Sequence, residues 1–143
     1  MTTSTASAVW EGGLKTGKGN FSAGSGAFQG AYSFSTRFEG AKGTNPEELI
    51  AAAHAACLSM ALAAGLEKAG TPAKKINTTA SCTIEVGGGG IKITRMKLVV
   101  RGTVPGIEQT AFSRAAEEAK DGCPVSGAMK GNVAFELDAI LLE

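Results

Sequence analysis

The sequence is poor in aromatic side chains and rich in small ones. Aromatic residues make up 6% of the 143 positions, with one tryptophan and one tyrosine, whereas 20 positions are glycine. Alanine is abundant as well, so we expect a core built from small side chains that let neighbouring backbones approach closely. The glycines lie among apolar segments, and they therefore predict many turns, not a disordered tract.

An excess of charge of one sign is also lacking, because 14 basic residues are balanced by 13 acidic residues to a net charge of +1. The sequence contains no run of lysine and arginine and no acidic tail. Binding to nucleic acid requires a basic patch that neutralises phosphates. We therefore expect no nucleic-acid partner.

The third expectation is that no targeting segment is present. Residues 1–8 are polar, without the basic and apolar regions of a signal peptide. Residues 49–66 form the one long apolar stretch, but they are mostly alanine and carry His54 and Ser59. We predict a core helix there, no membrane, and a cytoplasmic protein. In the cytoplasm a pair of cysteines is more often catalytic or metal-binding than structural.

The length predicts a single domain over residues 1–143. The first 40 residues are predicted to form strands and turns, with a short apolar strand at residues 8–11. Residues 32–39 alternate between aromatic or apolar and polar side chains, which predicts a half-buried strand with Arg37 and Glu39 on its polar face.

A long helix is predicted over residues 46–68. Asn45 can cap its start, Pro46 suits the first helical position, and Glu48 completes the spacing of a capping box. Apolar residues surround this helix on every side, and such a helix must be covered all round. We therefore expect a partner protomer to contribute to its burial.

The second half of the chain continues the mixture of strands and helices. The remaining predicted elements are strands at 78–86, 91–101 and 133–142 and a helix at 107–120. A shift in the apolar phase between Ile93 and Met96 predicts a β-bulge. Strands and helices in this order predict the α+β fold class.

Three cysteines and the single histidine are candidates for chemistry. Cys57 lies mid-helix among alanines, where a cysteine is often an inert packing residue. Cys123 precedes Pro124 at a predicted helix start, whose N-terminus would stabilise a thiolate. Cys82 alternates with apolar residues on a strand, so we expect it to pack in the core. His54 lies one turn before Cys57 and could be a base, a metal ligand or a packing residue.

Zinc binding is an alternative, because His54, Cys57 and Cys123 could supply three of four ligands. The sequence has no C-x-x-C motif and no obvious fourth ligand, so this pattern is weak. Arg37 could simply be an exposed residue of its predicted strand. Glu47 could simply interact favourably with the dipole at the start of its helix. Glu47 and Cys57 are ten positions apart, about 15 Å along one unbroken helix. If both belong to one site, Glu47 must come from a second chain across a two-fold axis.

Several short motifs recur together in a fixed order along nearly the whole chain. They are Trp10-Glu11-Gly12, Gly17-Lys18-Gly19, Thr36-Arg37-Phe38-Glu39-Gly40, Gly43-Thr44-Asn45-Pro46-Glu47-Glu48-Leu49-Ile50, Ala53-His54-Ala55-Ala56-Cys57, Val104-Pro105-Gly106-Ile107 and Gly122-Cys123-Pro124-Val125-Ser126. In this combination the sequence resembles the OsmC (osmotically inducible protein C) family, relatives of the organic hydroperoxide resistance proteins. The Arg-Phe-Glu-Gly and His-Ala-Ala-Cys stretches resemble OsmC proper more than that sister branch.

The resemblance implies an intertwined α+β homodimer, in which two antiparallel sheets wrap paired central helices and sites lie at the interface. It implies that Cys57 is the peroxidatic cysteine and Cys123 the resolving one. Arg37 matches the family's active-site arginine, and Glu47 its active-site carboxylate. Cys82 matches no functional position, and no cofactor is implied.

The expected activity is a cysteine-based peroxidase of a stress response. It would reduce organic hydroperoxides, and hydrogen peroxide less readily, through a Cys57 sulfenic acid and a Cys57–Cys123 disulfide. Arg37 would favour the Cys57 thiolate and Glu47 would orient Arg37. The family points to dihydrolipoamide or a lipoylated protein as the dithiol reductant. A non-catalytic dimeric module that binds a small ligand or zinc is the alternative.

Overall fold

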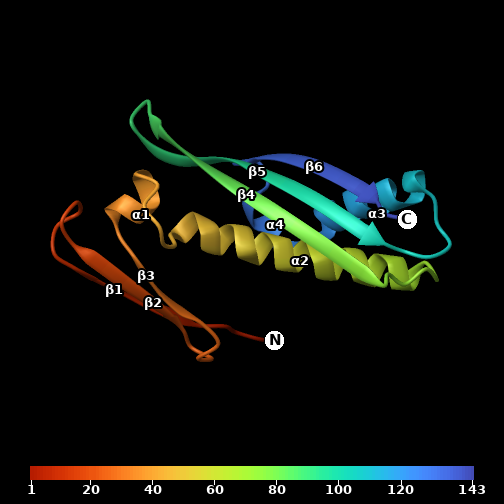
Figure 1. The fold of residues 1–143 in the computed structure, drawn as a ribbon, viewed down its shortest axis with the longest axis horizontal. Coiled ribbons are helices and arrows are strands. Elements are labelled where there is room, and N and C mark those ends of the chain that lie inside the picture. Colours follow the sequence, from red (N-terminus) through yellow and green to blue (C-terminus); the bar gives the residue numbers. More distant parts are fainter. The chain divides into compact units, whose positions relative to one another are not determined.

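The computed structural model describes residues 1–143 and divides into two units, Met1–Leu49 and Ile50–Glu143. The single domain predicted for residues 1–143 stays a prediction. In chain order the elements are β1 (Ala6–Glu11), β2 (Lys18–Ala23), β3 (Gln29–Tyr32), α1 (Phe34–Phe38), α2 (Pro46–Lys68), β4 (Lys75–Gly87), β5 (Gly90–Thr103), α3 (Gln109–Gly122), α4 (Pro124–Met129) and β6 (Ala134–Leu141) (Figure 1). This mixture of helices and two separate sheets confirms the α+β fold class.

The first unit contains an antiparallel sheet in the order β1-β2-β3. Trp10 and Phe21 both pack against Tyr32, with ring centroids 5.5 Å and 5.8 Å apart. The rings cover Gly19, where an added Cβ would lie 2.6 Å from the Tyr32 ring and 2.7 Å from the Trp10 ring. The small residue therefore makes room for the aromatic cluster that holds this sheet together.

The strand predicted over residues 32–39 is wrong beyond Tyr32, because α1 begins directly after Ser33. The Ser33 hydroxyl accepts a hydrogen bond from the Thr36 N–H at 3.3 Å, and the Thr36 hydroxyl accepts one from the Ser33 N–H at 2.9 Å. This capping box starts the helix. The rings of Phe34 and Phe38 are then one turn apart and 5.0 Å from each other. The alternation of aromatic and polar side chains in this short segment is thus compatible with a helical turn as well as with a strand.

Helix α2 begins and ends as the sequence predicts. The Asn45 side chain accepts a hydrogen bond from the Glu48 N–H at 2.8 Å and so caps the helix. The helix crosses from the first unit into the second without interruption. It is the one helix whose length and composition would suffice to cross a membrane, a test that core helices of soluble proteins also pass.

The second unit contains a sheet in the order β4-β5-β6. The bulge is confirmed, since Thr83 pairs with Arg95 and Ile84 with Ile93, which leaves Thr94 as the extra residue. Strand β6 pairs with β5 in parallel, so the expectation of an antiparallel sheet is wrong at this edge. Parallel neighbours need a crossover connection, and α3 and α4 supply it.

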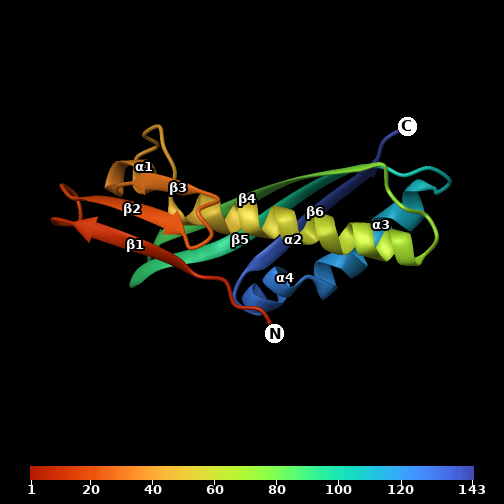
Figure 2. The same ribbon diagram turned by 90° about the horizontal axis from the view of Figure 1, so that it is seen from below.

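The core of the second unit lies between this sheet and the helices, which Figure 2 shows from below with α2 in front of the strands. Leu58, Leu62 and Leu66 form the buried stripe of α2. They pack with residues of β5 and α3, among them Leu98 and Phe112, into one apolar cluster. Buried side chains therefore fix α2 and α3 to the same face of the sheet.

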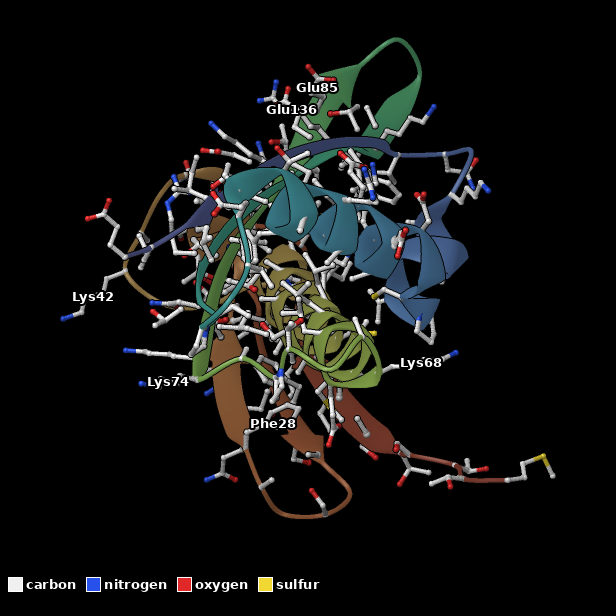
Figure 3. All side chains as sticks on the ribbon, turned by 90° about the vertical axis from the view of Figure 1, so that its right-hand side faces the viewer. Phe28, Lys42, Lys68, Lys74, Glu85 and Glu136 are labelled. Carbon is white, nitrogen blue, oxygen red and sulfur yellow. The ribbon has the colours of Figure 1, made fainter.

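The opposite faces of the sheet and of α2 differ in character. The outer face of the sheet is polar and carries the ion pairs Arg95–Glu136 and Arg101–Asp138, and Figure 3 shows Glu136 on the far side of the sheet from α2. The face of α2 that is exposed in the single chain is apolar instead. It comprises Ala52, Ala53, Ala56, Met60, Ala63 and Ala64. Of the residues in the most apolar stretch of α2, only 28% are buried within the single chain.

Candidate active site

Two of the three cysteines meet in the second unit. Cys57 lies in the middle of α2, and Cys123 lies between α3 and α4, where it is the N-cap of α4 with Pro124 at the first turn, as predicted. A hydrogen bond joins the two thiols. Cys57 is half-buried, whereas Cys123 is only 1% exposed. A reagent from solvent therefore reaches Cys57 and not Cys123.

The two thiols differ in acidity. Burial and the neighbouring Cys123 raise the pKa of Cys57, and the Val125 N–H opposes this only in part. Burial would also raise the pKa of Cys123, but hydrogen bonds from Cys57 and Ser126 and the N–H groups at the start of α4 outweigh it and leave this pKa lowered. A single chain thus holds Cys57 as the protonated, less nucleophilic thiol.

An ion pair between Arg37 and Glu47 dominates the charged part of the first unit. Arg37 donates from Nη2 to Glu47 Oε1 at 2.7 Å and from Nε to the same carboxylate at 3.0 Å and 3.3 Å. Glu47 is 5% exposed, whereas the Arg37 side chain keeps 35% of its surface accessible. Arg37 and Glu47 are therefore in direct contact, and the role of Glu47 in orienting Arg37 at an active site stays a prediction.

Local capping explains why these two side chains meet. Asn45 caps α2 with its carbonyl oxygen and donates from its amide nitrogen to the Thr36 carbonyl at 3.1 Å. This second bond ties the start of α2 to α1, which carries Arg37. The Arg37 guanidinium also lies over the Phe38 ring, 5.1 Å from its centroid. The guanidinium is thereby held from two sides.

Arg37 borders an apolar cavity of about 210 Å³ in the first unit. Its lining residues are Trp10, Leu14, Tyr32, Ser33, Phe34, Arg37 and Phe38. A small apolar group could fill such a cavity while a polar group next to it contacts the guanidinium. The sequence did not reveal this cavity, because its walls come from β1, the following loop, the end of β3 and α1.

His54 and Ser126 form a buried hydrogen bond that the sequence did not reveal. His54 Nε2 lies 2.7 Å from Ser126 Oγ, and the two residues are 0% and 3% exposed. Burial lowers the pKa of His54, so the imidazole is neutral at physiological pH. Ser126 could have been found as the third residue of the helix that Cys123 caps, a position whose side chain reaches back to the cap.

The remaining predictions concern zinc and Cys82. No three His, Cys, Asp or Glu side chains in residues 1–143 lie together as a metal site, so His54 does not join the cysteines as a ligand set. Cys82 lies on β4 opposite the buried Met96, which confirms its place on the core face.

Comparison with known proteins places this arrangement in a family. The model for OsmC-like proteins matches residues 39–138. The chain belongs to the OsmC-like family. It is 48% identical to the peroxiredoxin OsmC of Escherichia coli (strain K12) over 90% of this chain and 91% of that protein. It is 33% identical to an organic hydroperoxide resistance protein of Xanthomonas axonopodis pv. citri over 66% of this chain and 65% of that protein.

The solved structures agree with this assignment. The organic hydroperoxide resistance protein OhrB of Bacillus subtilis superposes with a TM-score of 0.71 at 28% identity, covering 94% of this chain and 97% of that protein. The higher identity to an OsmC than to a hydroperoxide resistance protein agrees with the motifs around Arg37 and Cys57, which resemble OsmC proper.

Proposed function

We propose that this chain is a thiol peroxidase that reduces organic hydroperoxides with Cys57 as the attacking cysteine and Cys123 as the resolving one. A peroxidase activity in general follows from membership of the family and from the 48% identical peroxiredoxin. The single observation that carries the cysteine assignment is the contact between a solvent-accessible Cys57 and a buried Cys123.

The reaction balances in two steps. The Cys57 thiolate attacks the distal peroxide oxygen, the O–O bond breaks, and protonation of the leaving alkoxide gives an alcohol and a Cys57 sulfenic acid. The Cys123 sulfur then attacks the Cys57 sulfur, so that the S–S bond forms as the S–O bond breaks and water leaves. An external dithiol must reduce this disulfide, and dihydrolipoamide or a lipoylated protein is the reductant that we expect.

A second protomer completes the site in this proposal. The pKa of Cys57 is raised in the single chain, whereas peroxide attack needs the thiolate, so a cation must approach Cys57. Glu47 and Cys57 are ten residues apart on an unbroken helix, about 15 Å along its axis. Two antiparallel copies of α2 would bring the Arg37–Glu47 pair of one protomer to Cys57 of the other. The exposed alanines and Met60 of α2 suit such close helix packing.

The substrate class follows from the cavity beside Arg37. Its aromatic lining suits the hydrocarbon part of an organic hydroperoxide, which hydrogen peroxide lacks. The guanidinium would hydrogen-bond the peroxide oxygen on which negative charge develops. We place the protein in the cytoplasm, where a dithiol reductant keeps cysteines reduced.

The test is a single challenge of the fully reduced protein with one equivalent of cumene hydroperoxide. We expect two of the three thiols to disappear, with a Cys57–Cys123 bridge mapped by mass spectrometry and one alcohol formed per bridge. Cys57→Ser should abolish the reaction, and Cys82→Ser should leave it intact. Retention of all three thiols in the wild type after the challenge would disprove the proposal.

A further inference from the structure

A buried histidine lies beside the thiol pair without a role in the proposed chemistry. His54 is fully buried, and its ring packs edge-on against Phe135 at a centroid distance of 5.5 Å. Nε2 is bonded to Ser126 Oγ at 2.7 Å, while Nδ1 is buried without a hydrogen-bond partner. Such an unpartnered nitrogen costs stability, so its retention calls for a reason.

The partners of the ring settle which nitrogen carries the proton. If Ser126 donated to Nε2, the N–H would be at Nδ1 and would be buried without an acceptor, which is rare in proteins. A proton at Nε2 instead leaves only an acceptor lone pair bare at Nδ1. His54 therefore donates Nε2–H to Ser126 Oγ, and the serine O–H is free to point elsewhere.

The other neighbour of Ser126 is Cys123. Ser126 is the third residue of α4 and Cys123 its N-cap, a spacing at which a side chain reaches back to the cap. The two residues are 3% and 1% exposed, and the Ser126 side chain hydrogen-bonds the Cys123 sulfur. Water does not compete at this depth, so the serine O–H has the sulfur as its acceptor.

We propose that His54 and Ser126 are positioning residues for the resolving cysteine: His54 donates to Ser126 and thereby directs the serine O–H at the Cys123 sulfur. The inference rests on the proposed Cys57–Cys123 disulfide. The serine hydrogen bond stabilises the Cys123 thiolate, which attacks the sulfur of the Cys57 sulfenic acid. The S–O bond breaks, and the proton lost by Cys123 ends on the leaving hydroxide as water. No oxidant or reductant beyond the peroxide is needed.

The experiment compares variants that remove each donor with variants that keep it. Ser126→Ala removes the hydroxyl and Ser126→Thr keeps it. His54→Phe keeps a buried ring without a donor, and His54→Gln keeps an N–H near the position of Nε2. Ser59→Ala is the matched control. Ser59 lies on α2, as His54 does, and its hydroxyl donates a hydrogen bond to the Thr78 hydroxyl and not to a thiol.

Two measurements report on Cys123 itself. In a Cys57→Ser/Cys82→Ser background, where Cys123 is the one remaining cysteine, the pH dependence of the ultraviolet absorbance of the thiolate gives the thiolate fraction of Cys123 without a reagent having to reach it. The lifetime of the Cys57 sulfenic acid after one equivalent of cumene hydroperoxide, sampled by dimedone trapping, gives the resolving rate. We expect Ser126→Ala and His54→Phe to shift the thiolate titration of Cys123 to higher pH and to lengthen the lifetime of the Cys57 sulfenic acid about tenfold, as loss of one hydrogen bond to a charged group implies.

Ser126→Thr and His54→Gln should restore values close to those of the wild type and of Ser59→Ala. Failure of the wild type to form the disulfide would disprove the proposed function. If the wild type forms the disulfide and Ser126→Ala leaves both the thiolate titration of Cys123 and the sulfenic acid lifetime unchanged, only the positioning role is overturned. Ser126→Ala removes a single oxygen atom and decides the question alone if His54→Phe does not fold.

Discussion

Arg37 is fixed by its surroundings more tightly than a surface arginine. Three hydrogen bonds to Glu47 and a contact with the Phe38 ring restrict the guanidinium. Most exposed ion pairs contribute little to stability, because water screens them and side-chain entropy opposes them. Glu47 is only 5% exposed, so the Arg37–Glu47 pair is held in one geometry. The proposed role of Arg37 in orienting a peroxide requires such a fixed geometry.

The first prediction tests that geometry with Arg37→Lys, which keeps the charge and loses the planar fork. We expect the rate of cumene hydroperoxide reduction to fall about tenfold or more, in line with the loss of one preorganised donor. Steady-state turnover with dihydrolipoamide measures it. Arg101→Lys, in a pair with Asp138 on the outer face of the second sheet, should keep the wild-type rate. Equal rates for both variants would contradict the role of Arg37.

The second prediction concerns the charge of His54. Burial lowers its pKa below 6.5 in the folded chain, so the unfolded chain binds the proton more readily. The free energy of unfolding should therefore be fully retained above pH 6.5 and should fall as the pH drops below it, by at most ~1.4 kcal/mol per pH unit from this group. Urea unfolding at fixed protein concentration measures it. His54→Gln should show a shallower fall, and an identical pH dependence would refute the assignment.

At the scale of elements, close approach between β5 and α3 depends on one glycine. An added Cβ at Gly102 would lie 2.5 Å from the ring of Phe112, which is fully buried. The third prediction is that Gly102→Ala lowers the free energy of unfolding by about 1–3 kcal/mol, because the ring must shift. Gly122→Ala, with no atom within 4 Å of the added Cβ, should not destabilise the chain. Chemical denaturation of both variants measures the difference.

Local signals in the sequence predict the elements that depend on them. The sequence predicts helix α2 over residues 46–68 because Asn45 specifies its start and the residues after Lys68 specify its end. The segment after Tyr32 was mispredicted as a strand. In a segment as short as α1, side chains that repeat every four residues in a helix cannot be told from side chains that alternate in a strand. The parallel pairing of β6 was missed because it joins strands distant in sequence, which no local pattern encodes.

The candidate site divides in the same way. Cys57, Cys123, Arg37 and Glu47 were predicted through the family resemblance, and the contacts within each pair are now visible. Ser126 was missed because nothing in the neighbouring sequence distinguishes it, and only its contact with His54 sets it apart. The aromatic cavity was missed because its walls come from separate segments of the chain.

At the scale of the molecule, the exposed apolar face of α2 leads us to predict association with a second copy. Met60 is 77% exposed in the single chain and lies among exposed alanines. The fourth prediction is that Met60→Glu yields a monomer with little peroxidase activity, because a buried charge would lie between the paired helices. Analytical ultracentrifugation and turnover measure this. Lys97→Glu, on the polar outer face of the second sheet, should remain an active dimer, and a dimeric, active Met60→Glu protein would rule out pairing through this face.

The contact between Cys57 and Cys123 has a consequence for the lifetime of the protein in the cell. A bond between them would close a loop of 123 − 57 = 66 residues. Closing a loop of this length restricts the unfolded chain and adds about 4 kcal/mol to stability. Proteases that act on transiently opened chains would then degrade the oxidised form more slowly than the reduced form. A shortage of reductant would thus lengthen the half-life of the protein, because more of it would be in the oxidised form.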